Sequence, residues 1–327
     1  MTECLQGLFL LPTRQKLIFE ECFYARINPL HIIEIAENQV TTTDKISNCK
    51  ICGAHSCHKV VYVVDGYSIS KCEACGVGRA DLDNFDPCSY YDSGYFTGKY
   101  EHSYKDYIGS KEILSREFAN TLKFMRSVGP EQGNLLEVGC AYGLFLQQAK
   151  AHFDVHGVEL VQEAVSYCHE HGLANVKHGV LTKADLEKWG VMDVAVMLDV
   201  IEHLDNVAET VSMIAEHLRP GGSFIVTTGD WNSIVARLSG PRWRLMAPPL
   251  HLWYFTPRSL EKLGQRFGLE VISRSHPWKF VPFELIVHQA KTMLGFTANV
   301  HLPESLKTLG FPASLHDAMR IVFRKLA

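Results

Sequence analysis

The sequence lacks a large excess of charge of either sign. Its 327 residues include 32 Lys and Arg against 36 Asp and Glu, which gives a formal net charge of −4 at pH 7. Holding a polyanion requires a positive field, and no run of Lys or Arg supplies a local one. Nucleic acid is therefore disfavoured as a partner.

Long apolar runs, internal repeats and low-complexity tracts are also lacking. No apolar stretch reaches the roughly 20 residues that span a bilayer. Near the N-terminus, Leu8–Leu11 is apolar, but it follows the acidic Glu3 and no basic residue, unlike a secretory signal. We therefore expect no transmembrane segment and a cytoplasmic protein. Hydrophobic residues still make up 46% of the chain, enough for a sizeable core.

The length fits about two domains, and the composition changes along the chain in four steps. Residues 1–48 form an arm to which we attach no chemistry. Residues 49–88 hold paired cysteines, and 89–130 contain an aromatic segment followed by a helical pattern, a linker or lid. Residues 131–327 form the largest domain.

Two cysteine pairs stand out among the ten cysteines, Cys49-x-x-Cys52 and Cys72-x-x-Cys75, each followed by glycine. Two such turns can present four thiolates to one tetrahedral zinc ion, with no coordination position left for catalysis. Two redox pairs or unrelated buried thiols are the competing interpretations. The nearby His55, Cys57 and His58 could replace a ligand, but we expect the four cysteines to bind structural zinc.

From Asn134 onward, short apolar runs alternate with helical periods, which predicts a doubly wound α/β sheet. We expect Arg219–Gly222 to separate a helix from the next strand, and Thr256 to cap a further helix. Predicted strands are 135–138, 155–159, 176–180, 192–198, 223–228 and 269–273, and predicted helices are 104–127, 144–151, 161–171 and 207–218.

A glycine-bearing turn follows the first predicted strand, in Leu135–Gly143. Gly139 would let the backbone pass close to a ligand, and Gly143 would let a helix start against the strand. Glu159 ends the second strand, where an acidic side chain can hold both ribose hydroxyls. Glu137 would repel the pyrophosphate of a dinucleotide but favour a positively charged amino group. The pattern therefore favours an amino-acid-bearing nucleoside.

Four motifs in this order resemble those of class I S-adenosylmethionine-dependent methyltransferases: Glu137–Gly143, Glu159, Leu198–Leu204 and Leu218–Gly222. They cover roughly residues 104–275. The likeness is strongest to the broad group that includes the ubiquinone-biosynthesis O-methyltransferases and many glycan- and natural-product-modifying enzymes. It implies a seven-stranded Rossmann-like sheet with an antiparallel last strand. It also implies S-adenosyl-L-methionine as cofactor.

The resemblance assigns cofactor contacts as well. Gly139, Cys140 and Gly143 would line the methionine part through their backbone, Glu159 would hold the ribose, and an acidic residue near adenine could be Asp185. Ala141 replaces the commoner middle glycine, a change of one methyl that we expect to be tolerated. The implied set is Glu137, Gly139, Cys140, Gly143, Glu159, Leu160, Val180, Leu181, Asp199 and Val200.

Methyl transfer from a sulfonium is an in-line displacement, for which an enzyme aligns the acceptor and, for a hydroxyl or carbon acid, supplies a base. His203 follows the fourth predicted strand, and His251 lies after the fifth, where this group usually contacts acceptors. Each histidine is a candidate base or a hydrogen-bonded residue that shapes the pocket. Tyr91 and Tyr95 could fold over the cofactor as part of a lid, or simply pack.

Residues 317–325 resemble the seventh strand of this superfamily, so residues 277–314 would be an insertion rich in apolar side chains. The insertion could cap the acceptor pocket, form a homodimer contact or lie on a membrane surface. Basic residues are few there, Lys279 and Lys291 among them, which favours the cap.

The sequence thus predicts O- or C-methylation of a small-molecule acceptor, such as a sugar, a lipid-linked compound or a natural-product intermediate. RNA or protein methylation is the second hypothesis, although the charge speaks against RNA. The asparagine- or aspartate-proline-proline-aromatic signature of adenine and glutamine methylation does not follow the fourth strand. A cofactor-binding scaffold without turnover is the third hypothesis, and a dehydrogenase is a distant fourth.

Overall fold

The computed structural model describes residues 45–82, 93–97, 107–282 and 310–327, all within one compact unit, Asp44–Ala327. Nearly all of the predicted arm, Tyr91 of the predicted lid and residues 283–309 of the predicted insertion lie outside the described residues. The three roles considered for the insertion therefore stay predictions.

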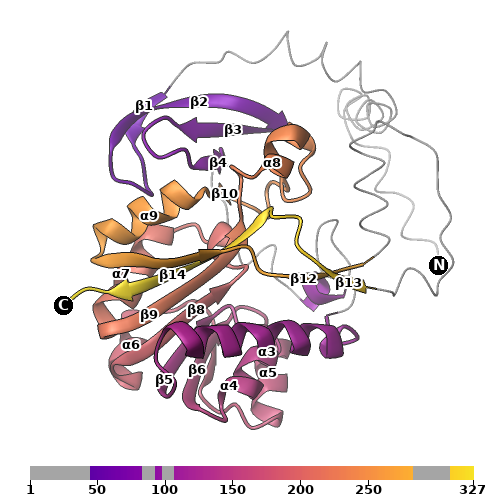
Figure 1. Cartoon of the computed structure of the whole chain (residues 1–327), viewed down its shortest axis with the longest axis vertical. Helices are drawn as coiled ribbons and strands as arrows, with labels where there is room; N and C mark the ends of the chain where they lie inside the picture. Colours follow the sequence, from indigo (N-terminus) through magenta and orange to yellow (C-terminus); the bar gives the residue numbers. More distant parts are fainter. Residues whose placement is uncertain (1–44, 83–92, 98–106, 283–309) are drawn as a thin grey trace, which may run out of the picture. The chain divides into compact units, whose positions relative to one another are not determined.

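A seven-stranded sheet with the order β11-β14-β9-β8-β5-β6-β7 forms the centre of this unit (Figure 1). Its strands from β5 to β9 run parallel, whereas β14 is antiparallel to both of its neighbours. The predicted doubly wound sheet with an antiparallel last strand is confirmed. The strands are β5 (Gly133–Val138), β6 (Phe153–Glu159), β7 (Val176–His178), β8 (Met192–Leu198), β9 (Leu218–Gly229), β11 (Leu269–Ser275) and β14 (Ala318–Lys325).

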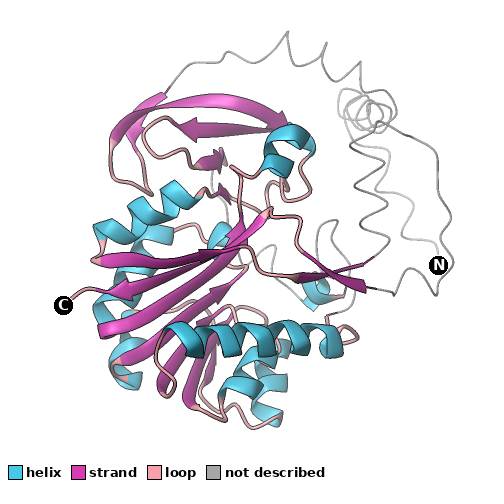
Figure 2. Cartoon of the chain, viewed as in Figure 1, coloured by secondary structure: helices cyan, strands magenta, loops and turns pink. Residues whose placement is uncertain are grey.

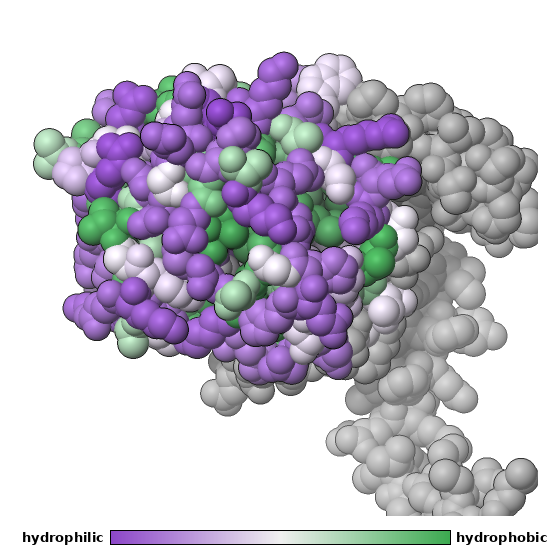
Figure 3. Space-filling model, turned by 90° about the horizontal axis from the view of Figure 1, so that it is seen from below, coloured by the Kyte–Doolittle hydropathy of each residue, from purple (hydrophilic) through white to green (hydrophobic). Residues whose placement is uncertain are grey.

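Helices cover both faces of this sheet (Figure 2). On one face, α3 to α5 bury side chains such as Met125, Phe145 and Val165, while on the other α6, α7 and α9 bury Leu186, Val211 and Leu263. The surface on the side of α4 and α5 is largely hydrophilic (Figure 3). The helices are α3 (Lys111–Val128), α4 (Leu144–Ala149), α5 (Gln162–Glu170), α6 (Lys183–Trp189), α7 (Val207–His217), α8 (Ile234–Ser239) and α9 (Pro257–Arg266), with the 3-10 helices η3 (Ser93–Phe96), η4 (Ile201–His203) and η5 (Gly240–Arg242).

The structure differs from the sequence prediction at Arg219–Gly222. This segment was expected to precede the fifth strand, but β9 already begins at Leu218. Residues 219–221 are exposed, and the pairing register of β8 with β9 shifts between Met192 and Val194. The exposed Gly221 and the buried Gly222 therefore belong to an irregular start of the strand.

A second, five-stranded antiparallel sheet contains the paired cysteines and has the order β1-β2-β3-β4-β10. Its fifth strand, β10 (Trp253–Tyr254), comes from the segment after β9, far along the chain. Cys49, Cys72 and Cys75 share one buried cluster with Trp253 and the core of the central sheet. The predicted cysteine module is therefore continuous with the α/β domain. Its other strands are β1 (Lys45–Asn48), β2 (His55–Val64), β3 (Tyr67–Cys72) and β4 (Gly78–Ala80).

Two further strands, β12 (Lys279–Pro282) and β13 (Gly310–Ala313), pair antiparallel at the two ends of the predicted insertion. In the part of the chain that is described, no helix combines the length and apolarity needed to cross a bilayer.

Candidate cofactor and acceptor site

The turn after β5 has the backbone that was predicted for cofactor binding. Gly139 has a φ of +72°, and a Cβ added there would lie 2.6 Å from Val200 Cγ2. Gly143 has a φ of +66°, and its added Cβ would lie 2.4 Å from Leu173 Cδ1. Conformation and space both demand glycine at these two positions. Ala141, between them, also has a left-handed φ of +48°.

Glu159 connects the end of β6 to this turn. Its Oε2 accepts a hydrogen bond from the Ala141 amide at 2.8 Å, and its Oε1 accepts one from the Val161 amide at 2.9 Å. Burial raises the pKa of this carboxyl, although the two amides oppose the rise. Each carboxylate oxygen can accept a further hydrogen bond, which suits a ribose diol.

Glu137 is a buried acid without a complete set of partners. Its side chain is 3% exposed, and its Oε2 has no hydrogen-bond partner among the described residues. Burial raises the pKa of this carboxyl well above its usual value, and Cys168 and Glu159 add to the rise. A ligand ammonium would supply the missing partner, so the residue fits the amino group of S-adenosyl-L-methionine.

Three other residues of the predicted cofactor set lie near this turn. The thiol of Cys140 is buried, and a hydrogen bond with Cys168 and burial both raise its pKa, so its backbone is the part suited to a ligand. Asp199 has a φ of +57°, and its Oδ1 accepts a hydrogen bond from Thr227 Oγ1 at 3.0 Å. Val200, the next residue, contacts Gly139, so the segments after β5 and β8 meet.

The residues of the proposed cofactor set that follow β7 differ in exposure. Val180 follows β7 with 62% of its surface exposed, whereas Leu181 is buried. Asp185, considered as an acidic neighbour of adenine, forms a capping box with Thr182 at the start of α6. It also pairs with Lys177 at 2.5 Å, so its carboxylate is already engaged.

The remaining cofactor residue, Leu160, directly follows β6. Its carbonyl accepts a hydrogen bond from His178 Nε2 at 2.9 Å. Leu160 lies between Glu159 and Val161, which are hydrogen-bonded to each other.

The two candidate bases lie against each other. The ring centroids of His203 and His251 are 4.8 Å apart, and the rings are inclined by 72°. His203 Nδ1 donates to the Leu250 carbonyl at 2.8 Å, and His251 Nδ1 donates to the Leu245 carbonyl at 2.7 Å. Because a carbonyl only accepts, the proton of each neutral ring is on Nδ1 and the basic nitrogen is Nε2.

Glu202, which was not predicted from the sequence, forms a cluster of three with these histidines. One ligand atom from each of Glu202, His203 and His251 lies within 4.8 Å of the others. Burial raises the pKa of Glu202 to about 7, opposed by His251 and supported by Asp199. Burial also lowers the pKa of His203. The signal was the acid directly before His203 at the carboxyl end of a buried strand.

Of the two predicted lid tyrosines, the described one lies beside this cluster. The rings of Tyr95 and His203 are 6.5 Å apart in an edge-to-face arrangement. The next residue, Phe96, packs against Tyr142 of the cofactor turn at 5.2 Å. The short helix η3 therefore lies next to both the acceptor cluster and the cofactor turn.

The comparison with known proteins agrees with this architecture. A family described as a methyltransferase domain matches residues 110–274, half of the chain. The chain belongs to this methyltransferase family. The ubiquinone biosynthesis O-methyltransferase of Rickettsia conorii is 31% identical to this chain over 100 residues, which are 29% of this chain and 34% of the relative. That of Cereibacter sphaeroides is 29% identical over 182 residues, 52% of this chain and 71% of the relative.

The methyltransferase thus spans about a third of the length of the Rickettsia conorii relative. Similar solved structures include the magnesium protoporphyrin IX methyltransferase of Synechocystis PCC 6803 with bound SAH, at 12% identity and a TM-score of 0.43 over 67% of this chain and 87% of that chain. Another is an Archaeoglobus fulgidus SAM-dependent methyltransferase, at 15% identity and a TM-score of 0.45 over 66% and 95%.

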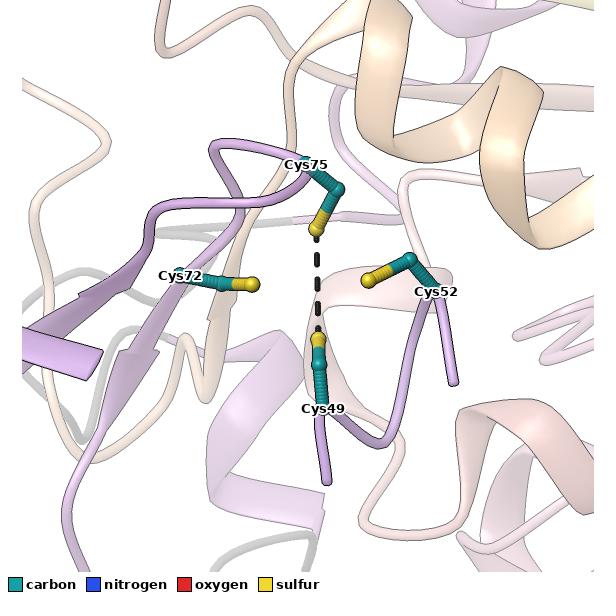
Figure 4. A group of neighbouring side chains, drawn as sticks. All are labelled: Cys49, Cys52, Cys72 and Cys75. Atoms are coloured by element: carbon teal, nitrogen blue, oxygen red, sulfur yellow. Dashed lines mark hydrogen bonds between the residues drawn. The ribbon is translucent and has the colours of Figure 1, made fainter. Parts of the chain in front are cut away.

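The four cysteines of the methyltransferase point toward one common centre (Figure 4). All four sulfurs lie within 4.8 Å of one another, and Cys49 Sγ and Cys75 Sγ are 3.9 Å apart. Sulfurs bound tetrahedrally to zinc at 2.3 Å would be about 3.8 Å apart. Cys52 and Cys72 complete the set, so the geometry suits the predicted ion.

Proposed function

We propose that this methyltransferase transfers the methyl group of S-adenosyl-L-methionine to an oxygen or carbon of a small-molecule acceptor in the cytoplasm. The observation that carries the proposal is the position of the His203–His251 pair. Val200 contacts Gly139 of the cofactor turn, and η4 with His203 begins at the next residue. A histidine pair thus lies where the segments after β5 and β8 meet, at the edge of the sheet that binds ligands in this fold class.

The cofactor would be held by the turn after β5 and the ends of its neighbouring strands. When bound, S-adenosyl-L-methionine supplies an electrophilic methyl group. Glu137 would accept a hydrogen bond from its amino group, and Glu159 would bind the ribose. The other proposed contacts are Gly139, Cys140, Gly143, Leu160, Val180, Leu181, Asp199 and Val200.

His251 or His203 would act as the catalytic base. In both rings, Nδ1 carries the proton and donates it to a backbone carbonyl. The basic Nε2 would therefore receive the proton of the acceptor. Glu202, buried next to both rings, would stabilise the imidazolium that forms. The name O-methyltransferase of the relatives supports a hydroxyl acceptor.

The test begins with calorimetric titration of S-adenosylhomocysteine, for which we expect micromolar affinity. SAH release is then measured with S-adenosyl-L-methionine and a panel of sugars, phenols and lipid-linked alcohols. The substitution that removes the catalytic base, His251→Gln or His203→Gln, should lower kcat by about 10²- to 10⁴-fold. The affinity for SAH should stay within twofold. His152→Gln, an exposed control, should change neither value. A folded protein without SAH affinity would refute the proposal.

A second mode of acceptor activation is supported by the cluster of Glu202, His203 and His251. Two imidazoles and one carboxylate are a common ligand set for divalent transition metals. Both Nδ1–H groups are held by carbonyls, which is typical of histidines that bind a metal through Nε2. A divalent ion there would make a hydroxyl acceptor more acidic. Manganese titration, followed by electron paramagnetic resonance, should show binding that His251→Gln removes, whereas a pure base mechanism predicts none.

We also propose that Cys49, Cys52, Cys72 and Cys75 hold structural zinc. The distances between their sulfurs support it. Metal analysis should find about one zinc per chain that is lost in Cys72→Ser. Full retention of zinc in that variant would show that the ligands were assigned wrongly.

A further inference from the structure

The turn that presents two of the cysteines is directly attached to strand β4. The Cys72 amide donates to the Val77 carbonyl at 2.9 Å, and β4 starts at the next residue, Gly78. On the other side of the same turn, Thr256 Oγ1 donates to the Cys75 carbonyl at 3.4 Å. The conformation of this turn therefore determines where β4 begins.

Strand β4 in turn holds β10. Trp253 lies opposite Arg79 and Tyr254 opposite Gly78 in an antiparallel pair, and the Ala80 amide donates to the carbonyl preceding β10 at 2.9 Å. The guanidinium of Arg79 also lies 5.1 Å from the centre of the Trp253 ring. With only two residues, β10 depends on this neighbour for its strand conformation.

The segment that leads into β10 contacts the acceptor cluster directly. The Leu252 amide donates to the Glu202 carbonyl at 2.9 Å, and the Leu250 carbonyl accepts the hydrogen bond of His203 Nδ1. His251 lies between these two residues. Residues 250–252 are thus bonded to both other members of the cluster and carry its third member.

The cofactor turn is held by other contacts. Glu159 bonds to Ala141 and Val161, and the Gly139 amide donates to the Val158 carbonyl at 2.9 Å. All of these residues belong to β6 or to the segments after β5 and β6. A change at the four cysteines should therefore disturb the acceptor histidines more than the cofactor turn.

We propose that the four-cysteine site positions the acceptor histidines: its ion fixes β4, β4 fixes β10, and β10 holds His251 against His203 and Glu202. The proposal rests on the zinc site proposed above. Loss of the ion releases residues 250–256 and separates the cluster, while the cofactor turn keeps its structure. The cysteine site then sets the affinity and alignment of the acceptor, and not the affinity of the cofactor.

Hydrogen–deuterium exchange of the full chain tests this without an acceptor. In Cys72→Ser, the amides of Ala80 and Leu252 should exchange at least tenfold faster than in the unaltered chain. Residues 139–146 should be accelerated less than these two amides, by no more than the loss of global stability accounts for, and SAH should bind within twofold of its original affinity. Cys57→Ser, a cysteine of the same sheet outside the four-sulfur group, is the matched control and should behave like the unaltered chain.

A second variant disturbs the contact between β4 and β10 and leaves the four cysteines in place. A Cβ at Gly78 would lie 2.5 Å from the Trp231 ring, which packs against Tyr254 of β10. Gly78→Ala should retain one zinc per chain and still show the faster exchange at Leu252. Gly66→Ala lies in the turn between β2 and β3, where φ is +83° and the added Cβ would meet no atom within 4 Å. It strains only this turn of the same sheet, so the exchange at Leu252 should stay unchanged.

Unchanged exchange at Leu252 in zinc-free Cys72→Ser, or in Gly78→Ala, would overturn the proposal. Equal loss of protection at residues 139–146 would overturn it too, because the ion would then support the whole fold and not this segment. Retention of zinc by Cys72→Ser would remove the zinc assignment and the proposal with it. None of these results depends on whether methyl transfer has been detected.

Discussion

At the scale of single residues, Glu159 shows how a cofactor contact can also be part of the scaffold. Its two oxygens already bind the amides of Ala141 and Val161, so the side chain shapes the turn that it is proposed to complete with a ribose. Removing it affects the ligand contact and the turn together.

We expect Glu159→Ala to weaken SAH binding at least tenfold, about 1.4 kcal/mol, because the ribose contact and the anchor of Ala141 are both lost. Calorimetric titration measures the change. Asp185→Asn is the control, since this acid caps α6, and its SAH affinity should be unchanged. Equal affinities for Glu159→Ala and the unaltered chain would exclude Glu159 from the cofactor site.

His156 offers a second prediction at this scale, on stability. The ring is 5% exposed and lies against Trp189 with the ring centroids 5.2 Å apart, and neither of its nitrogens has a hydrogen-bond partner among the residues described. Burial lowers its pKa below the usual value near 6.5, opposed by Asp154. The unfolded chain therefore takes up a proton at a higher pH than the folded one. Stability is complete above about pH 6.5 and falls as the pH drops toward the folded pKa.

His156→Phe should remove this pH dependence and raise the free energy of unfolding by about 1 kcal/mol, because two unsatisfied nitrogens leave the core. Urea unfolding at pH 5.5 and 7.5 measures both effects, with the exposed His152→Phe as control. If His156→Phe and the unaltered chain lose the same stability between these pH values, another group causes the loss.

At the scale of secondary-structure elements, a buried ion pair fastens the segment before His251 to the central sheet. Asp317, just before β14, is 1% exposed and accepts hydrogen bonds from Arg244 Nε at 2.8 Å and Nη2 at 2.9 Å. Trp243 Nε1 adds a third at 3.1 Å. Burial raises the pKa of Asp317, but Arg244 outweighs it and the pKa is lowered overall.

Asp317→Ala should lower the free energy of unfolding by about 3 kcal/mol, because it leaves the Arg244 charge without its partner. The exposed pair Arg274–Glu261 has the same shortest distance, 2.8 Å, so Glu261→Ala is the matched control. We expect it to cost less than about 1 kcal/mol. Denaturant unfolding of both variants at pH 7 compares them, and equal losses would mean that burial does not strengthen this pair.

Elements with strong local signals were predictable from the sequence. The apolar run of β8 has the predicted bounds, and Thr256 caps α9 as its position before Pro257 suggested. In contrast, β10 was not predicted, because two residues carry no period and the partner strand is far away in the chain. The six-residue helix α8 was also missed, since Ile234 and Leu238 are apolar yet 74% and 73% exposed.

The same distinction applies to the site. The spacing of the cysteines predicted which side chains would meet, because each pair is fixed by its own turn. His203 and His251 were named separately, and their contact depends on the folding of two distant segments. Glu202 had a sequence signal, its position directly before His203, but its burial and its place beside His251 depend on the tertiary structure.

At the scale of the whole molecule, the cysteine sheet and the central sheet share one hydrophobic core. Ile51 and Val77 in the turns of the former pack in the same cluster as Leu136 and Phe224 of the latter. Two parts with a common core are expected to lose their structure together.

Calorimetry should therefore show a single unfolding transition for the two sheets, coincident with loss of zinc. Cys72→Ser should lower the Tm of this transition by at least about 5 °C, roughly 2 kcal/mol for a chain of this size. Cys57→Ser should leave it within 2 °C, as a rough limit for a substitution outside the cluster. Two separate transitions, of which only one responds to zinc, would show that the cores are independent.

The origin of β10 in the segment after β9 has a practical consequence for dissecting the protein. A shortened chain that begins after β4 would keep the whole central sheet, yet Trp253 and Tyr254 would lose the strand that covers their backbone. Such an uncovered edge, flanked by aromatic side chains, can recruit the same edge of another molecule. The fragment would be expected to self-associate, so the catalytic half of this chain should be studied only together with its cysteine half.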